Sequence, residues 1–160
     1  MIPLLFLFLA AADPGGYLGA RWGMTPDQVL GTVPQAERNL GPDDLTPSNG
    51  TVTSILIKEV TIAAVPMKVY FRFGEKSGQL ENVYVSATRE IDKRPGDFDR
   101  IAALMVEKYG RPWTGSSAED QTARWTFETT TIELHLFISK VIGFRSLSIM
   151  YQPRKTDAPI

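Results

Sequence analysis

The sequence contains no cysteine and only one histidine, His135. The missing thiols exclude disulfides, cysteine nucleophiles, thiolate metal sites and a lipid-modified N-terminal cysteine. A single imidazole excludes any site that needs two histidine ligands. The chain also lacks an excess of basic residues, because 17 Lys and Arg stand against 18 Asp and Glu. We therefore expect no nucleic-acid partner.

What the chain does contain is an ordinary globular composition. It has 160 residues, of which 43% are hydrophobic and 22% charged. These values are too apolar for a disordered chain, and the length suits one domain. We expect a single domain over residues 13–152, preceded by a signal peptide at 1–12 and followed by a flexible tail at 153–160.

The first twelve residues have the pattern of a secretory signal peptide. Ile2 to Ala12 is an uncharged apolar run of eleven residues, whereas a membrane-spanning helix needs about 20. Ala10-Ala11-Ala12 is a small-residue cleavage motif, and the turn-forming Asp13-Pro14-Gly15-Gly16 follows it. The alternative is a buried N-terminal strand. We expect cleavage after Ala12, export to the periplasm or the medium, and no transmembrane segment in the mature chain.

Hydrophobic periodicity and capping residues predict the elements of the fold. Thr25 and Gln28 form a capping box with Pro26 at the first helical position, which predicts a short helix. A second, longer helix is expected to begin at Asp97 as its N-cap and to end before Gly110. Alternating or β-branched residues predict six strands, at 51–62, 67–73, 80–87, 125–127, 132–138 and 147–151.

This order, helix followed by three strands, occurs twice. The apolar spacing of Met67 to Val85 matches that of Ile132 to Ile149, apart from one residue in the hairpin turn. We therefore expect an α+β fold of two helix-plus-three-strand repeats, at about 17–90 and about 95–152. Together they would form a sheet of about six antiparallel strands with the helices on one face.

Several of these segments resemble a known family. Gly23-Met24-Thr25-Pro26-Asp27-Gln28-Val29 looks like the Gly-Met-Thr-x-x-x-Val signature of the BamE-like (SmpA/OmlA) outer-membrane lipoproteins. Residues 67–85 resemble the strand pair of that domain, and Tyr109-Gly110-Arg111-Pro112 is similar to its Leu-Gly-x-Pro. The resemblance implies helices packed on an antiparallel sheet. The tandem arrangement implies the fold of the β-lactamase-inhibitory proteins.

No pattern predicts a catalytic or metal site. His135 lies between Leu134 and Leu136, so it is expected on the sheet face opposite the helices. The acidic pairs Asp43-Asp44 and Glu119-Asp120 lie in polar loops without metal-ligand spacing, and solvation explains both. We expect no catalytic residue, no metal and no cofactor.

One group of residues suggests a binding surface. Strand parity places seven large or charged side chains on the face away from the helices, and aromatic residues, Arg and Met are enriched at protein interfaces. The alternative is that they only pair across strands. The residues are Tyr70, Arg72, Tyr84, Arg124, His135, Phe137 and Met150.

From these features we expect an exported, non-enzymatic domain that binds a protein or an envelope component through this face. Two other classes stay open. One is a hydrolase that uses carboxylates on the loop from Pro34 to Gly50. The other is a structural envelope domain without a specific ligand.

Overall fold

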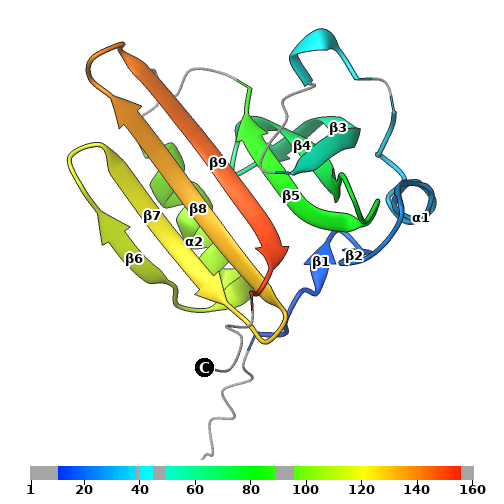
Figure 1. Cartoon of the computed structure of the whole chain (residues 1–160). Helices are drawn as coiled ribbons and strands as arrows, with labels where there is room; N and C mark the ends of the chain where they lie inside the picture. The colour runs from blue at the N-terminus through cyan, green and yellow to red at the C-terminus, as the bar shows by residue number, and fades with distance from the viewer. Residues whose placement is uncertain (1–10, 39, 45–49, 89–95, 156–160) are drawn as a thin grey trace, which may run out of the picture.

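The computed structural model describes residues 11–38, 40–44, 50–88 and 96–155. Over these residues the chain is mostly β, with 50% in strands and 17% in helices (Figure 1). The elements, in chain order, are β1 Gly16–Tyr17, β2 Ala20–Arg21, α1 Pro26–Thr32, the 3₁₀ turn η1 Pro42–Asp44, β3 Thr51–Ile62, β4 Val65–Gly74, β5 Leu80–Ala87, α2 Asp97–Tyr109, β6 Trp113–Ser116, β7 Asp120–Thr126, β8 Thr130–Ser139 and β9 Phe144–Pro153.

One antiparallel sheet of seven strands dominates the described part of the chain, in the order β3-β4-β5-β9-β8-β7-β6. Two meanders, β3 to β5 and β6 to β9, make up this sheet. They join where β5 pairs with β9, through the opposed residues Val83 and Tyr151, Tyr84 and Met150, Val85 and Ile149, and Ser86 and Ser148. The last strands of the two meanders therefore lie side by side at the middle of the sheet (Figure 1).

The predicted α+β fold of two helix-plus-three-strand repeats is wrong. Within the described residues the second half has four strands, and a separate two-stranded sheet of β1 and β2 precedes α1. Strand β6 could not be recognised from the sequence, because three of its four residues are exposed and the fourth is Gly115. An alternating apolar pattern reports only strands that bury one face.

Individual elements follow the sequence more closely than the architecture does. The predicted strands 51–62 and 80–87 are confirmed by β3 and β5. Thr25 caps α1 in the predicted capping box with Gln28. The cap of α2 was assigned wrongly, because Gly96 is the N-cap and Asp97 is the first residue of the helix. In the expected tail, Pro153 still belongs to β9, and residues 156–160 lie outside the described residues.

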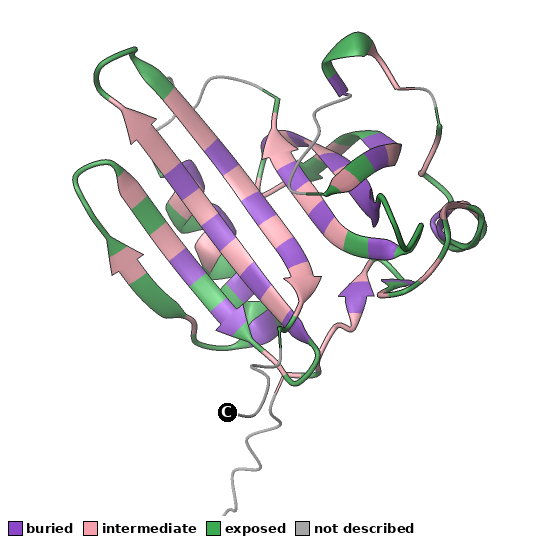
Figure 2. Ribbon diagram, in the orientation of Figure 1, coloured by how far each residue is buried: buried purple, intermediate pink, exposed green. Residues whose placement is uncertain are grey.

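The core lies between the sheet and α2. Buried and half-buried residues alternate along β8 and β9, as expected for strands with one face on a core (Figure 2). On α2, Ile101 and Met105 are buried against this face. Val29 of α1 and Ala20 of β2 belong to the same apolar cluster, so the N-terminal elements extend the core beyond α2. No helix in the described part of the chain is long and apolar enough to cross a membrane.

The segment that follows the expected cleavage site is attached to the sheet. The Asp13 carboxylate accepts hydrogen bonds from the backbone amide and the hydroxyl of Thr129, at 2.5 and 2.9 Å. Thr129 lies in the turn between β7 and β8. Asp13 therefore anchors the first of the described residues to this turn, while residues 1–10 of the predicted signal peptide lie outside the described residues.

Two tryptophans test this arrangement. Trp125 is 3% exposed, lies 6.4 Å from the Tyr109 ring and donates a hydrogen bond to the Gly110 carbonyl at 2.7 Å. Replacing it with alanine should lower the free energy of unfolding by ~3–5 kcal/mol. Trp113 is 60% exposed on the edge strand β6, so Trp113→Ala should cost less than about 1 kcal/mol. Urea unfolding of both variants measures the difference, and equal losses would contradict the placement of β6 and β7.

Candidate functional site

The surface of the sheet turned away from α2, which we call the outer face, carries all seven residues predicted from strand parity. The strand register places one row of directly opposed residues across the whole sheet, and opposed residues share a face. From β3 to β6 this row consists of Leu56, Tyr70, Tyr84, Met150, Glu133, Arg124 and Trp113. Arg72 and His135 lie in the adjacent rows of the same face, and Phe137 lies one row beyond His135.

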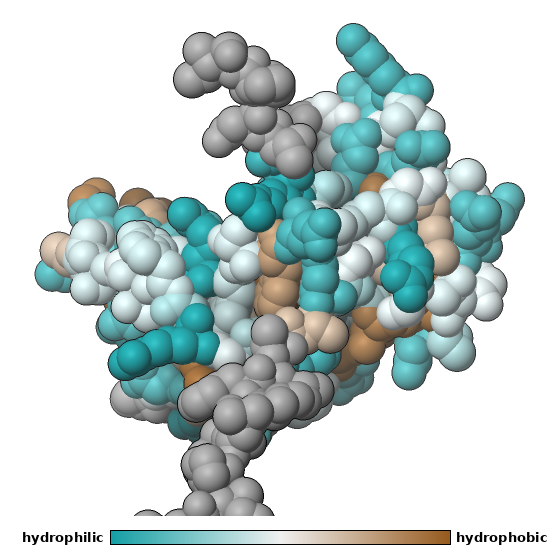
Figure 3. All heavy atoms as spheres, turned by 90° about the horizontal axis from the view of Figure 1, so that it is seen from below, coloured by the Kyte–Doolittle hydropathy of each residue, from teal (hydrophilic) through white to brown (hydrophobic). Residues whose placement is uncertain are grey.

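The outer face is closed at one side and open at the other. Leu56 on β3 is completely buried, whereas Trp113 on β6 is 60% exposed. Between them Tyr70, Tyr84 and Met150 are half-buried. Viewed from below, the surface of the described residues is mostly hydrophilic and has only short apolar stripes near its middle (Figure 3). On the outer face itself, strand register sets Met150 beside Glu133, and Tyr70 lies two residues from Arg72 on the same strand, so large apolar groups lie among polar neighbours.

Aromatic stacking fixes the side chains at the centre of the outer face. The rings of Tyr70 and Tyr84 stack across β4 and β5 with their centroids 6.2 Å apart. The guanidinium carbon of Arg72 lies 4.5 Å from the centroid of the Tyr84 ring, in a cation–π contact. Because stacked rings have few rotamers, this part of the surface is preorganised.

The turn η1 packs on the same face through Asp44. One carboxylate oxygen accepts hydrogen bonds from the Lys68 ammonium at 3.1 Å and the Tyr70 hydroxyl at 3.2 Å. The other accepts the backbone amide of Gly41 at 2.8 Å. The Gly41 bond, with those from Lys68 and Tyr70, outweighs burial and lowers the pKa of Asp44. Burial, helped by the bond to Asp44, raises the pKa of Tyr70 to about 12.

Solvation therefore does not explain both members of the loop pair Asp43-Asp44. Asp43 is exposed, as expected, but Asp44 is buried and holds η1 against β4. The sequence could not separate the two, because the side-chain partners of Asp44 lie 24 and 26 residues further along the chain.

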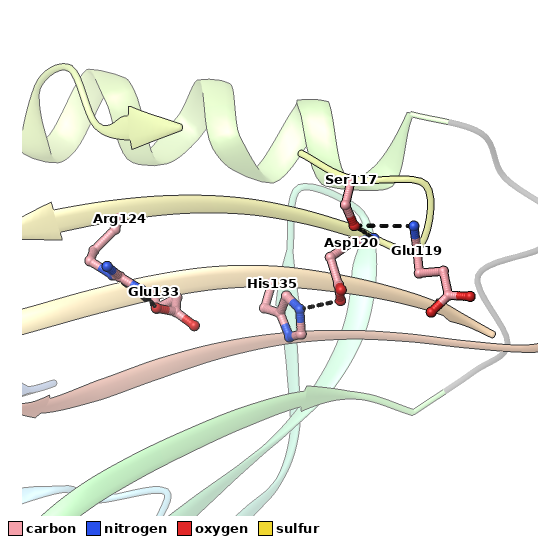
Figure 4. A network of polar contacts seen from close by, with 6 residues as sticks. All are labelled: Ser117, Glu119, Asp120, Arg124, Glu133 and His135. Atoms are coloured by element: carbon pink, nitrogen blue, oxygen red, sulfur yellow. Dashed lines mark hydrogen bonds and ion pairs between the residues drawn. The ribbon is translucent and has the colours of Figure 1, made fainter. Parts of the chain in front are cut away.

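At the open side of the sheet, Arg124 links two strands. Two of its nitrogens donate to one carboxylate oxygen of Glu133 at 2.9 and 2.6 Å (Figure 4). Its guanidinium carbon also lies 5.3 Å from the centroid of the Trp113 ring. A Cβ added to Gly115 would come within 2.6 Å of the Trp113 ring, so the absence of a side chain at Gly115 makes room for this ring. Trp113 is thus an outer-face residue that sequence reasoning missed. The Trp-x-Gly spacing is the signal that could have found it.

His135 and Asp120 form a second polar pair on the outer face. The imidazole Nε2 of His135 lies 2.8 Å from a carboxylate oxygen of Asp120 (Figure 4). The backbone amide of Asp120 donates a hydrogen bond to the Ser117 hydroxyl. Beside the pair is an open depression of about 340 Å³ that includes Trp113, Ser117, Asp120 and Thr122 among its lining residues. Among the described residues, Asp120 is the one side-chain hydrogen-bond partner of His135.

The remaining predicted residues complete the surface. Phe137 is half-buried and lies opposite Asp120 on β7 and Ser146 on β9. Met150 lies between Tyr84 and Glu133. The described residues contain no group of three or more His, Asp or Glu side chains arranged to hold a metal ion.

Compared with known proteins, the chain matches no family model, no curated protein and no solved structure. The resemblance to BamE-like proteins therefore stays a prediction.

The role of Asp44 can be tested by its pH dependence. Because its pKa is lowered in the folded protein, its contribution to stability is present above the ordinary value of 3.8 and disappears as the pH falls below it. Asp44→Asn should lose ~1–3 kcal/mol of unfolding free energy at pH 7, and this deficit should shrink at pH 3. Asp43→Asn is the matched control and should stay within ~0.5 kcal/mol of the wild type at both pH values. A deficit of the same size at pH 7 and pH 3 in urea unfolding would contradict this role.

Proposed function

We propose that this chain is an exported, non-enzymatic domain that binds a protein partner through the outer face. The observation that carries the proposal is the row of Tyr70, Tyr84, Met150, Arg124 and Trp113, which crosses the sheet on the side opposite α2. Tyr, Trp, Arg and Met are the residue types enriched in the centres of protein interfaces.

The way these side chains are held supports binding rather than simple strand pairing. Tyr84 is fixed between the Tyr70 ring and Arg72, and Trp113 is fixed between Gly115 and Arg124. Fixed side chains lose less conformational entropy when a partner covers them. Strand pairing alone does not require an edge tryptophan that leaves 60% of its surface exposed.

The hydrolase alternative has less support from the described residues. It needs a loop carboxylate that can act on a substrate, but Asp44 is buried and engaged by Lys68, Tyr70 and Gly41. Asp43 is exposed. The export component of the proposal rests on the apolar run that ends at Ala12 and on the small residues before Asp13.

A double variant tests the binding surface. Tyr84→Ala with Phe137→Ala removes two half-buried outer-face rings that do not belong to the core cluster. The thermal midpoint should stay close to that of the wild type, and the free energy of unfolding should change by no more than ~1 kcal/mol. Partner binding in a pull-down from envelope extract should weaken about thirtyfold, which corresponds to ~2 kcal/mol.

The matched control is Leu104→Ala with Val106→Ala. Both residues are large, apolar and exposed on α2, at 47% and 41%, on the opposite side of the sheet. This variant should recover the partner as the wild type does. Equal recovery by the outer-face variant and the α2 variant would refute the proposal. If the Tyr84 change unfolds the domain, Trp113→Ala replaces it, since Trp113 lies outside the core.

A further inference from the structure

Arg72 is the least ordinary charged residue on the outer face. It is only 8% exposed, although it carries a guanidinium group. The Nε atom of Arg72 is completely buried and has no hydrogen-bond partner. The two terminal guanidinium nitrogens do not combine full burial with the lack of a partner in this way. A buried cation is unfavourable unless an opposite charge or several hydrogen bonds compensate for lost hydration.

Neighbouring strands add two further unpartnered polar atoms. Register places Arg72 of β4 between Thr53 of β3 and Asn82 of β5. The side-chain oxygen of Asn82 is buried without a partner, and so is the hydroxyl of Ser54, in the bulge that follows Thr53. Buried polar atoms are normally hydrogen-bonded, so a group of them on adjacent strands is a reason to look for a ligand.

The charge balance of the outer face indicates whether that ligand carries a positive or a negative charge. Each of the other basic side chains described on this face has its own carboxylate. Lys68 has Asp44 at 3.1 Å, Arg124 has Glu133 at 2.6 Å, and His135 has Asp120 at 2.8 Å. Arg72 has no acidic partner in the described part of the chain, and its one cation contact is with the Tyr84 ring. The surface around Tyr84 therefore carries an unbalanced positive charge.

The geometry favours a carboxylate over other anions. A guanidinium is a planar fork that matches a carboxylate with two parallel hydrogen bonds. A phosphate is more strongly charged and is usually held by several cations. The other cation on β4, Lys68, is already paired with Asp44. Tyr70 and Tyr84 beside Arg72 provide an apolar surface for a ring next to the acidic group.

We propose that Arg72 binds an acidic side chain of the protein partner, with a neighbouring aromatic residue of that partner packed on Tyr84. This inference rests on the proposed function and names the chemistry that the outer face recognises: an acidic residue beside an aromatic one. Burial lowers the pKa of Arg72, but a guanidinium starts from so high a pKa that the group remains a cation for an incoming carboxylate.

Short peptides test the site without the natural partner. The probes are the capped dipeptides acetyl-Phe-Asp-amide and acetyl-Phe-Asn-amide, acetyl-Asn-Phe with a free C-terminus, and inorganic phosphate. The readout is the Nε–H resonance of Arg72 in ¹H–¹⁵N NMR, with the Nε–H of Arg124 as an internal reference. We expect acetyl-Phe-Asp-amide to shift the Arg72 signal in a saturable way, and the Asn peptide to leave it unchanged.

The variants separate recognition from folding. Arg72→Gln should weaken binding of acetyl-Phe-Asp-amide at least tenfold, measured on the Tyr84 ring signals, while Arg124→Gln should change it less than twofold. If Arg72→Gln does not fold, Arg72→Lys keeps the charge but not the fork, and it should also weaken binding. Binding of only the peptide with the free C-terminus would contradict the assignment to an acidic side chain.

Two further results would overturn the inference. In the first, neither acetyl-Phe-Asp-amide nor the peptide with the free C-terminus shifts the Arg72 signal. In the second, phosphate binds more tightly than these peptides. The outcome is distinguishable from failure of the proposed function. That function fails when the outer-face variant still recovers the partner, whereas the carboxylate site fails when the peptides do not bind the wild-type domain.

Discussion

The pairing of β5 with β9 determines the rest of this structure. Four opposed residue pairs join two separate antiparallel meanders into one sheet. Val85 and Ile149 in this pairing connect the two halves of the core, while Tyr84 and Met150 connect the two halves of the outer face. Without it, each meander would bury only a small core, and the row from Tyr70 to Trp113 would be interrupted at its centre.

The two sides of the sheet reach stability by different means. On the inner side, apolar residues are sealed by α2 and by the N-terminal elements, so burial of hydrophobic surface dominates. On the outer side, half-buried rings alternate with charges that are neutralised in pairs, such as Asp44 with Lys68 and Arg124 with Glu133. The partly exposed pair of Arg124 and Glu133 contributes little to stability, whereas the buried carboxylate of Asp44 contributes more, and both pairs hold neighbouring side chains in place. Arg72, which lacks an acidic partner in the described residues, departs from this pattern.

Part of this could be predicted from the sequence, for physical reasons that differ from element to element. The strands with one buried face were found, because alternation reveals them, and parity then placed Tyr70, Tyr84, His135 and Phe137 on a common face. Edge strand β6 was missed because both of its sides lack an apolar pattern, and Trp113 was missed with it. The side-chain partners of Asp44 could not be found either, nor the lack of an acidic partner for Arg72 among the described residues, because both depend on which distant segments the fold brings together. Local pattern also suggested six strands in two repeats, where the described chain has a seven-stranded sheet of unequal halves.

The central claim is that the outer face, and not the helix side, meets a protein partner. Site-specific photocrosslinking tests it most directly, with benzoylphenylalanine placed at Phe137 in one variant and at the exposed Leu104 of α2 in another. After irradiation in envelope extract, the account predicts a discrete adduct from position 137 and none from position 104. An adduct from position 104 with none from position 137 would contradict it.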